Sequence, residues 1–317
     1  MNIKIKGGQV VSGEITPSGS KNSAVAIIPS TILFDKPVTL ENVPSISDVE
    51  RLVKIMEKLG SKINWNKEKC TMQIDNSNFR FDDLDKDDLG NMKGTSLLWG
   101  PMLARFSHVD FKDLPGGCTL GIRPLDAHYE AFKDLGVKIE ETVGSVKMSA
   151  SKALAKNIWL VEMSPTATEN VITLATKLKG KTTITGAASE PQVQDLCNFL
   201  IKSGAKISGV GSNIIEIEGG HKLNPVKHSL LSDHYEITTF LALAAVTGGK
   251  IRIKNAIPEY FKHINFVFSK FGIDIKYEGD TAVISKPQNI RIVDGKNSAM
   301  TIKAQPWPSL PAARPGR

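Results

Sequence analysis

The sequence predicts an α/β fold built from a repeat of about 70 residues. Four segments share one pattern, in which an amphipathic helix ends in glycine and leads directly into a strand. They begin at Val49, His128, Leu196 and His263, and their glycines are Gly60, Gly136, Gly204 and Gly272. Glycine suits the end of a helix because the C-cap there adopts a left-handed conformation. The glycines are 76, 68 and 68 residues apart, which indicates a duplicated unit.

A recurring strand-and-turn pattern also supports the repeat. The stretches VTLENV at 38–43, TTITGA at 182–187 and IRIKNA at 251–256 each read as a strand that ends in Asn or Gly and then turns. Strands and helices therefore alternate within each unit, which predicts α/β architecture with internal pseudo-symmetry. A chain of 317 residues exceeds one ordinary hydrophobic core, so we expect two domains.

Composition limits the classes of partner. The formal charge of +7 favours anionic partners, and small phosphorylated or carboxylated substrates fit it. Only 6% of residues are aromatic, and no basic run is interleaved with aromatics, so we expect no nucleic acid. A basic nucleic-acid-binding protein stays an alternative function, and it would show a steep salt dependence of its affinity for DNA or RNA.

The cysteine spacing and the N-terminal sequence indicate whether the chain carries disulfides, a zinc site or a signal sequence. Cys70, Cys118 and Cys197 are far apart and odd in number, which argues against a disulfide framework and a zinc site. The first fifteen residues alternate like a strand and have no apolar signal core. No run approaches 18 apolar residues, so we expect no membrane span and a cytoplasmic protein.

The stretch LPGGCTLGIRPLDAH at 114–128 carries the strongest chemical signal. Its paired glycines allow a sharp turn and a close approach to a ligand. Arg123 would lower the pKa of the Cys118 thiol and make the sulfur reactive. The alternative is that Cys118 is a small buried apolar residue.

Two helix starts could hold ligands. In SGSKNSAVAIIPSTIL, Lys21 lies where a helix begins, next to free backbone N–H groups that attract phosphate or carboxylate. The alternative is a solvated lysine in the first turn. In SPTATENVITLATKL, Ser164 is an expected N-cap, and either a plain cap or a substrate contact.

Five stretches resemble one enzyme family in order and spacing. They are SGSKNSAV at 18–25, GPMLARF at 100–106, LPGGCTLGIRPLDAH at 114–128, EPQVQDLCNFLIKSGAKI at 190–207 and SDHYEITTFLALAA at 232–245. Over nearly its whole length the chain resembles the UDP-N-acetylglucosamine 1-carboxyvinyltransferases. The resemblance implies transfer of an enolpyruvyl group from phosphoenolpyruvate to the 3′-hydroxyl of UDP-N-acetylglucosamine, with release of phosphate. That reaction is the first committed step of peptidoglycan synthesis, and no metal or organic cofactor is expected.

The resemblance also implies a fold and its boundaries. The family has two inside-out α/β barrels built from such repeats. On this basis the first barrel domain comprises residues 20–229 and is complete. The second comprises residues 1–19 and 230–317 and is expected to be incomplete.

Roles for individual residues follow from matching motif positions. Cys118 would be the general acid that protonates the methylene carbon of phosphoenolpyruvate. Lys21 and Arg123 would hold its phosphate and carboxylate and stabilise developing charge. Asn22 would hydrogen-bond the acceptor sugar. The uridine-nucleotide site would consist of Arg123, Pro124, Leu125, Asp126 and Ala127, with Ser164 and Pro165. His128 is expected to orient this loop rather than to carry a proton.

The chain departs from the family pattern in three places. Lys93 replaces an arginine of the phosphoenolpyruvate region and keeps the charge without bidentate geometry. His234 replaces another arginine and is expected to be a weaker, pH-dependent cation. Ala313 replaces an aspartate taken as the base in the family, which continues beyond this point. We therefore expect impaired turnover, and self-association through uncovered apolar faces of the second domain.

Two alternatives stay open within the fold. One is a non-catalytic nucleotide-sugar-binding remnant of the family. The other is a relative of the shikimate-pathway enolpyruvyl transferase, although that enzyme lacks the Gly-Gly-Cys and Arg-Pro-x-Asp sequences found here.

Overall fold

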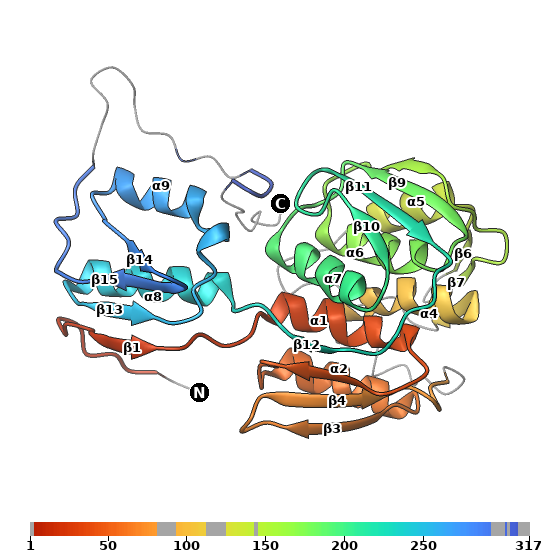
Figure 1. The fold of residues 1–317 in the computed structure, drawn as a ribbon, viewed down its shortest axis with the longest axis horizontal. Coiled ribbons are helices and arrows are strands. Elements are labelled where there is room, and N and C mark those ends of the chain that lie inside the picture. Colours follow the sequence, from red (N-terminus) through yellow and green to blue (C-terminus); the bar gives the residue numbers. More distant parts are fainter. Residues whose placement is uncertain are drawn as a thin grey trace, which may run out of the picture. The chain divides into compact units, whose positions relative to one another are not determined.

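The computed structural model describes residues 3–80, 93–111, 125–142, 145–292, 302 and 305–309. Contacts divide the chain into two lobes, shown in Figure 1. The large lobe runs from Ser20 to Leu231, and the small lobe combines the chain up to Gly19 with the segment from Ser232. Each lobe has its own hydrophobic core.

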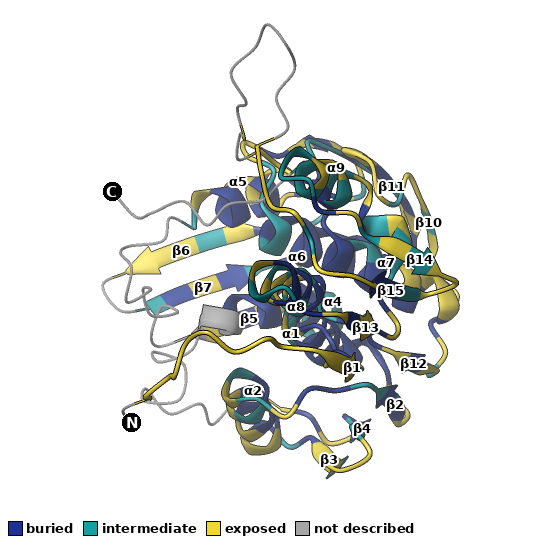
Figure 2. Cartoon of the chain, turned by 90° about the vertical axis from the view of Figure 1, so that its left-hand side faces the viewer, coloured by how far each residue is buried: buried dark blue, intermediate teal, exposed yellow. Residues whose placement is uncertain are grey.

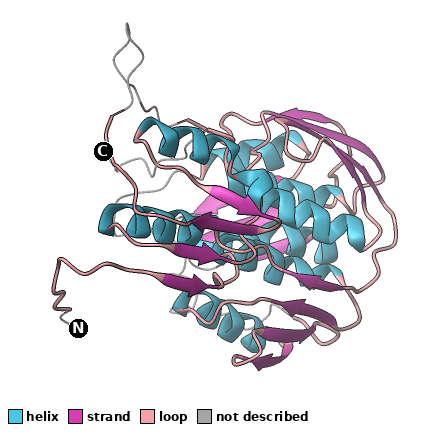
Figure 3. Ribbon diagram, turned by 60° about the vertical axis from the view of Figure 1, so that its left-hand side comes forward, coloured by secondary structure: helices cyan, strands magenta, loops and turns pink. Residues whose placement is uncertain are grey.

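Four repeats share one strand topology, and Figure 3 shows the strands in magenta. In each repeat the third strand pairs antiparallel with both the first and the second. The strands, repeat by repeat, are β2 (Val38–Glu41), β3 (Lys62–Asn66) and β4 (Thr71–Asp75); β5 (His108–Phe111), β6 (Lys138–Thr142) and β7 (Ser145–Ser149); β9 (Gly180–Thr185), β10 (Lys206–Ser208) and β11 (Ile214–Gly219); β13 (Ile251–Ile253), β14 (Lys276–Glu278) and β15 (Thr281–Ile284). This common order confirms the repeat that the glycine spacing predicts.

Three further strands extend these sheets in parallel. They are β12 (Lys227–Ser229) beside β2, β8 (Asn157–Trp159) beside β9, and β1 (Gly13–Ile15) beside β13. The N-terminal alternation predicts a longer strand than the structure contains. Ile3 and Ile5 lie outside β1 and are about four-fifths exposed. Alternation alone does not make a strand, because backbone N–H and C=O groups also need a pairing partner.

The second helix of each repeat is amphipathic and ends at a glycine. These helices are α2 (Ser47–Lys58), α5 (Asp126–Asp134), α7 (Pro191–Lys202) and α9 (Lys262–Lys270). The φ angles of Gly60, Gly136, Gly204 and Gly272 are 91°, 89°, 104° and 72°, all in the left-handed region. The predicted glycine caps are therefore confirmed. Figure 2 shows buried positions on one side of α2 and exposed positions on the other.

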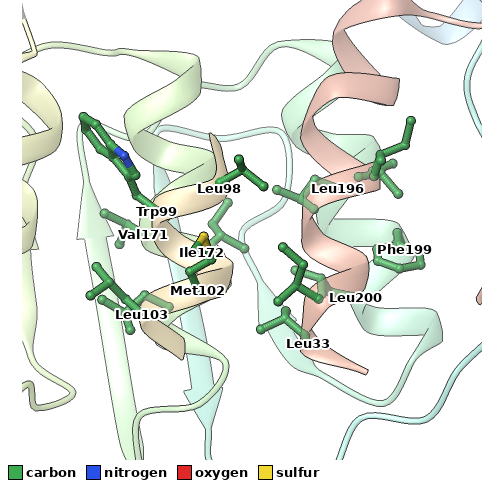
Figure 4. Packing of buried hydrophobic residues seen from close by; sticks show 14 of the residues in the cluster. Leu33, Leu98, Trp99, Met102, Leu103, Val171, Ile172, Leu196, Phe199 and Leu200 are labelled. Carbon is green, nitrogen blue, oxygen red and sulfur yellow. The ribbon is translucent and has the colours of Figure 1, made fainter. Parts of the chain in front are cut away.

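The first helix of each repeat is more apolar. These helices are α1 (Lys21–Ser30), α4 (Trp99–Phe106), α6 (Pro165–Ala175) and α8 (His234–Thr247). Within the large lobe, α6 contacts both α1 and α4. In Figure 4 the side chains of Met102 and Leu103 from α4 lie beside Val171 and Ile172 from α6. Nearly all of α6 is buried, including its polar residues Thr168, Glu169, Asn170 and Thr173, so these side chains need partners inside the fold.

Short 3₁₀ helices connect these elements. They are η1 (Thr31–Leu33), η2 (Lys93–Leu98) and η3 (Pro258–Tyr260). η1 continues α1, and η2 leads directly into α4. Four helix starts in the described part of the large lobe carry predicted site residues: those of α1, η2, α5 and α6.

Candidate functional site

The structure describes some of the predicted site residues and not others. Cys118, Arg123, Pro124 and Ala313 lie outside the described residues. Lys93 is the first residue of η2, and only its backbone is described. The remaining predicted residues lie at the starts of three helices of the large lobe: Lys21 and Asn22 on α1, Leu125, Asp126 and Ala127 at α5, and Ser164 and Pro165 at α6.

The start of α1 matches the sequence-based expectation for Lys21. Ser20 is the N-cap, and its Oγ accepts a hydrogen bond from the Ser23 N–H at 3.3 Å. Lys21 is the first helical residue, and its Nζ lies 3.5 Å from Oδ2 of Asp48. Both side chains are nearly half exposed, so this ion pair contributes little to stability. An anionic ligand could replace Asp48 beside Lys21 at small cost, with Asn22 in the same turn.

Ser164 is the N-cap of α6, as the sequence predicts. Its Oγ accepts from the Ala167 N–H at 3.4 Å, and Pro165 occupies the first helical position. The backbone oxygen of Ser164 accepts a hydrogen bond from Thr168 Oγ1 at 2.8 Å. These two hydrogen bonds fix Ser164 in place, so its hydroxyl has a defined position at the helix start.

The start of α5 is held by backbone hydrogen bonds to Leu125. Its carbonyl oxygen accepts from the N–H groups of His128 and Tyr129 at 2.9 and 3.1 Å. Asp126 is exposed in the first turn, where a carboxylate complements the helix dipole. Ala127 is buried beside it. Of these three residues, Asp126 is the one that presents a charged group to solvent.

A buried amide that the sequence analysis did not single out links three of these elements. Asn170, on α6, is 1% exposed. Its Oδ1 accepts from the Gly100 N–H of α4 at 2.7 Å, and its Nδ2 donates to the Ser96 carbonyl of η2 at 2.9 Å. The same Nδ2 lies 3.1 Å from Nδ1 of His128 on α5. The other ring nitrogen of His128 lies 3.0 Å from Thr166 Oγ1, near the start of α6.

Two buried acids lie on α6 and at the start of α7. Burial raises the pKa of Glu169 well above its usual value, and the negative charge of Glu190 adds to this. Burial likewise raises the pKa of Glu190, against hydrogen bonds from backbone N–H groups that lower it. The sequence offers one signal for Glu169: it is the one charged residue in the α6 stretch PTATENVITLA. Folding therefore favours the protonated form of both carboxyl groups, those of Glu169 and Glu190, more than water does.

Cys197, on α7, is a buried thiol of low reactivity. Burial first, and then the charge of Glu169, raises its pKa to about 12. A thiol with such a pKa is not a nucleophile or an acid at neutral pH. Cys197 is therefore a packing residue. It has the role of a small buried apolar residue, which is also the alternative reading of Cys118.

His234, in the small lobe, is a buried histidine at a helix start. It is the first residue of α8 and is 3% exposed. Burial lowers its pKa below the usual value, and the charge of Asp233 opposes this only in part. Its ring lies 4.2 Å from that of Tyr235 and 5.6 Å from that of Trp307, measured between centroids. A lowered pKa agrees with the expectation of a weaker, pH-dependent cation at this position.

Clusters of metal ligands and membrane-spanning helices are absent from the part of the chain that the structure describes. There, no group of three or more His, Cys, Asp or Glu side chains could hold a metal ion. Within the same residues, no helix has the length and apolar character needed to cross a membrane.

Comparison with known proteins identifies the fold. The sequence model of a family described as EPSP synthase (3-phosphoshikimate 1-carboxyvinyltransferase) matches residues 5–313. The structure is similar to the enolpyruvyl transferase NikO from Streptomyces tendae, with a TM-score of 0.76 and 22% identity over 89% of this chain and 67% of that one. It is also similar to EPSP synthase from Acinetobacter baumannii, with a TM-score of 0.68 and 16% identity over 90% and 67% of the two chains. The predicted inside-out α/β fold of the enolpyruvyl transferases is therefore confirmed.

Relatives with higher identity carry a more specific name. A UDP-N-acetylglucosamine 1-carboxyvinyltransferase from Bradyrhizobium diazoefficiens is 39% identical over 309 residues, covering 97% of this chain and 71% of that protein. One from Borreliella burgdorferi is 36% identical over 308 residues, with the same two coverages. From this similarity along almost its whole length, the chain belongs to the UDP-N-acetylglucosamine 1-carboxyvinyltransferase family.

Proposed function

We propose that this protein is a transferase that moves the enolpyruvyl group of phosphoenolpyruvate to the 3′-hydroxyl of UDP-N-acetylglucosamine and releases phosphate. The observation that carries the proposal is 36–39% identity over 97% of the chain to relatives named for this reaction. The shikimate-pathway alternative is not favoured, because the likeness to an EPSP synthase structure is 16% identity. The activity would serve cell-wall peptidoglycan synthesis in the cytoplasm.

The chemistry requires an acid and anion-binding groups. In the proposed sequence the Cys118 thiol donates its proton to C3 of phosphoenolpyruvate while the sugar 3′-oxygen adds to C2. The hydroxyl proton passes to a general base, a role that Ala313 cannot fill at the position of the family's aspartate, so turnover is expected to be impaired. The tetrahedral intermediate then loses phosphate and one methyl proton, which restores the carbon–carbon double bond. Cys118 suits the acid role better than Cys197, whose pKa of about 12 keeps it inert.

Helix starts supply the proposed binding groups. Lys21 and Lys93 begin α1 and η2, where a cation and backbone N–H groups together favour phosphate and carboxylate. With Arg123, they would bind phosphoenolpyruvate and stabilise charge in the intermediate. Asn22 would bind the acceptor sugar beside Lys21.

The nucleotide would bind at the starts of α5 and α6. The proposed contacts are Arg123, Pro124, Leu125, Asp126, Ala127, Ser164 and Pro165. Support comes from the defined position of the Ser164 hydroxyl and from the hydrogen bond between His128 Nε2 and Thr166 Oγ1, which ties α5 to the first turn of α6. No cofactor enters the proposed reaction.

A phosphate-release assay tests this function. Phosphate should appear only when phosphoenolpyruvate and UDP-N-acetylglucosamine are both present, and the product mass should equal the nucleotide sugar plus an enolpyruvyl group. Release with shikimate 3-phosphate as acceptor would favour the other transferase. Calorimetric binding of the nucleotide sugar without phosphate release would show a binding protein instead.

We also propose self-association through the small lobe. Leu243 and Val246 of α8 and Phe266 of α9 are exposed apolar side chains there. Burying such surface between copies would be favourable. Sedimentation equilibrium of the wild type and Val246→Lys tests this: the variant should be more monomeric, and equal behaviour of the two would contradict it.

A further inference from the structure

The orientation of the Asn170 amide is fixed by its backbone partners. The Gly100 N–H can only donate, so the atom 2.7 Å from it is the amide oxygen. The Ser96 carbonyl can only accept, so the atom 2.9 Å from it is the amide nitrogen. Asn170 therefore presents an N–H donor, and not an acceptor, to His128.

This orientation determines the state of the His128 ring. Nδ1, at 3.1 Å from the Asn170 nitrogen, must carry a lone pair to accept that hydrogen bond. A neutral imidazole then carries its proton on Nε2, which donates to Thr166 Oγ1 at 3.0 Å. The ring also packs edge-on against Trp99, with centroids 5.6 Å apart. His128 thus holds α5 to α6 as a neutral ring with one defined tautomer.

We propose that Asn170 and His128 are a pair of positioning residues for the substrate site. This inference rests on the proposed function. Three of the four elements that they join begin with proposed substrate contacts: η2 with Lys93, α5 with Asp126, and α6 with Ser164. Asn170 is 1% exposed and His128 5% exposed, so neither has the surface for a direct role in binding. They act by fixing where the phosphoenolpyruvate and nucleotide contacts stand relative to one another.

Few other side chains could make all the hydrogen bonds of Asn170. An amide at this position satisfies one donor and two acceptors from three different elements, and losing one partner leaves the others buried and unsatisfied. Displacing binding groups by a small distance reduces turnover strongly, because the reacting groups lose alignment. A purely structural pair would lower stability alone, whereas a positioning pair also weakens binding.

The first test is Asn170→Asp, which is nearly isosteric. The carboxylate still accepts from the Gly100 N–H, but it turns an acceptor toward the Ser96 carbonyl and toward His128 Nδ1. We expect kcat/KM for both substrates to fall on the order of 10- to 100-fold. We also expect weaker calorimetric binding of UDP-N-acetylglucosamine, and faster amide hydrogen exchange in residues 93–100 and 125–129.

Asn76 provides the matched control. It is a buried asparagine of the same lobe, 1% exposed, that accepts from Ser61 Oγ at 2.6 Å and donates to Thr31 Oγ1 at 3.0 Å. Its side-chain hydrogen-bond partners, Ser61 and Thr31, carry no proposed substrate contact. Asn76→Asp should lower the unfolding free energy comparably and leave the affinity for UDP-N-acetylglucosamine unchanged.

His128 provides a second route if Asn170→Asp does not fold. His128→Phe keeps a ring beside Trp99 and loses the hydrogen bonds to Asn170 and Thr166, so it should weaken binding. His128→Gln restores an acceptor and a donor and should recover most of the affinity.

The outcomes separate the two claims. If the wild type neither binds the nucleotide sugar nor turns over, the proposed function is wrong and the positioning role falls with it. If the wild type is active but Asn170→Asp or His128→Phe binds as tightly as the wild type, or Asn76→Asp weakens binding equally, the positioning role alone is overturned.

Discussion

Gly100 on α4 packs directly against the backbone of α6, and adding one methyl group there should be costly. A Cβ on Gly100 would stand 2.3 Å from both the Asn170 backbone oxygen and Thr173 Oγ1, and 2.8 Å from the Asn170 Cα. Two of these three atoms belong to the helix backbone, so the Gly100→Ala variant requires the helices to move apart by roughly 1 Å. Overpacking of this kind costs about 1–3 kcal/mol, and the gain in helix propensity from alanine offsets at most about 1 kcal/mol of it.

Urea unfolding followed by tryptophan fluorescence measures this effect. We expect the unfolding free energy of Gly100→Ala to fall by about 1–2 kcal/mol, since the overpacking term exceeds the propensity term. Gly7→Ala is the control, because a Cβ on Gly7 meets nothing within 4 Å. A Gly100→Ala variant as stable as the wild type would refute the close approach of α4 to α6. The same variant should also shift the hydrogen bond between Gly100 N–H and Asn170, and so weaken nucleotide-sugar binding.

Three further predictions concern stability. Because the folded state raises the pKa of Glu169, its contribution to the unfolding free energy is greatest below pH 4.5 and falls as the pH rises toward the folded value, by about 1.4 kcal/mol per pH unit. Glu169→Gln should flatten this fall in urea titrations between about pH 5 and pH 7, and an unchanged slope would contradict it. Gly60→Ala places a Cβ 2.4 Å from the Asn78 oxygen at a φ of 91°, and should lower the melting temperature by several degrees; no change would contradict the strained cap. His228→Ala removes the hydrogen-bond partner 2.9 Å from the buried Asp195 carboxylate and should cost about 1–3 kcal/mol in urea unfolding, because a buried polar group loses that partner; an unchanged unfolding free energy would contradict it.

The repeat could be predicted from sequence because its signals are local. Helical periodicity and a glycine cap lie within about 15 residues of one another, and Gly60, Gly136, Gly204 and Gly272 all adopt the left-handed conformation that this pattern requires. Helix starts at Lys21 and Ser164 were predictable for the same reason, because capping chemistry lies within one turn. The N-terminal strand was overestimated, since alternation says nothing about whether a neighbouring strand is present to pair with it.

The network around Asn170 could not be predicted in this way. Its partners Ser96 and His128 lie 74 and 42 positions away in the chain, and no local pattern marks an asparagine that will meet them. The burial of His234 could likewise not be predicted, because its residue type indicates only a titratable group, and the fold shows that burial lowers its pKa. The family resemblance supplied the roles of Cys118 and Arg123, which lie outside the described residues and stay predictions.

Thiol labelling at Cys118 tests the central claim most directly. The reagent is an epoxide that mimics phosphoenolpyruvate, and the readout is intact mass followed by peptide mapping, with and without UDP-N-acetylglucosamine. We predict a single adduct at Cys118 that forms faster when the nucleotide sugar is present and more slowly when phosphoenolpyruvate competes. Cys70→Ser should label like the wild type, and Cys118→Ala should not label. Labelling that avoids Cys118, or that proceeds at the same rate with and without the nucleotide sugar, would contradict the account.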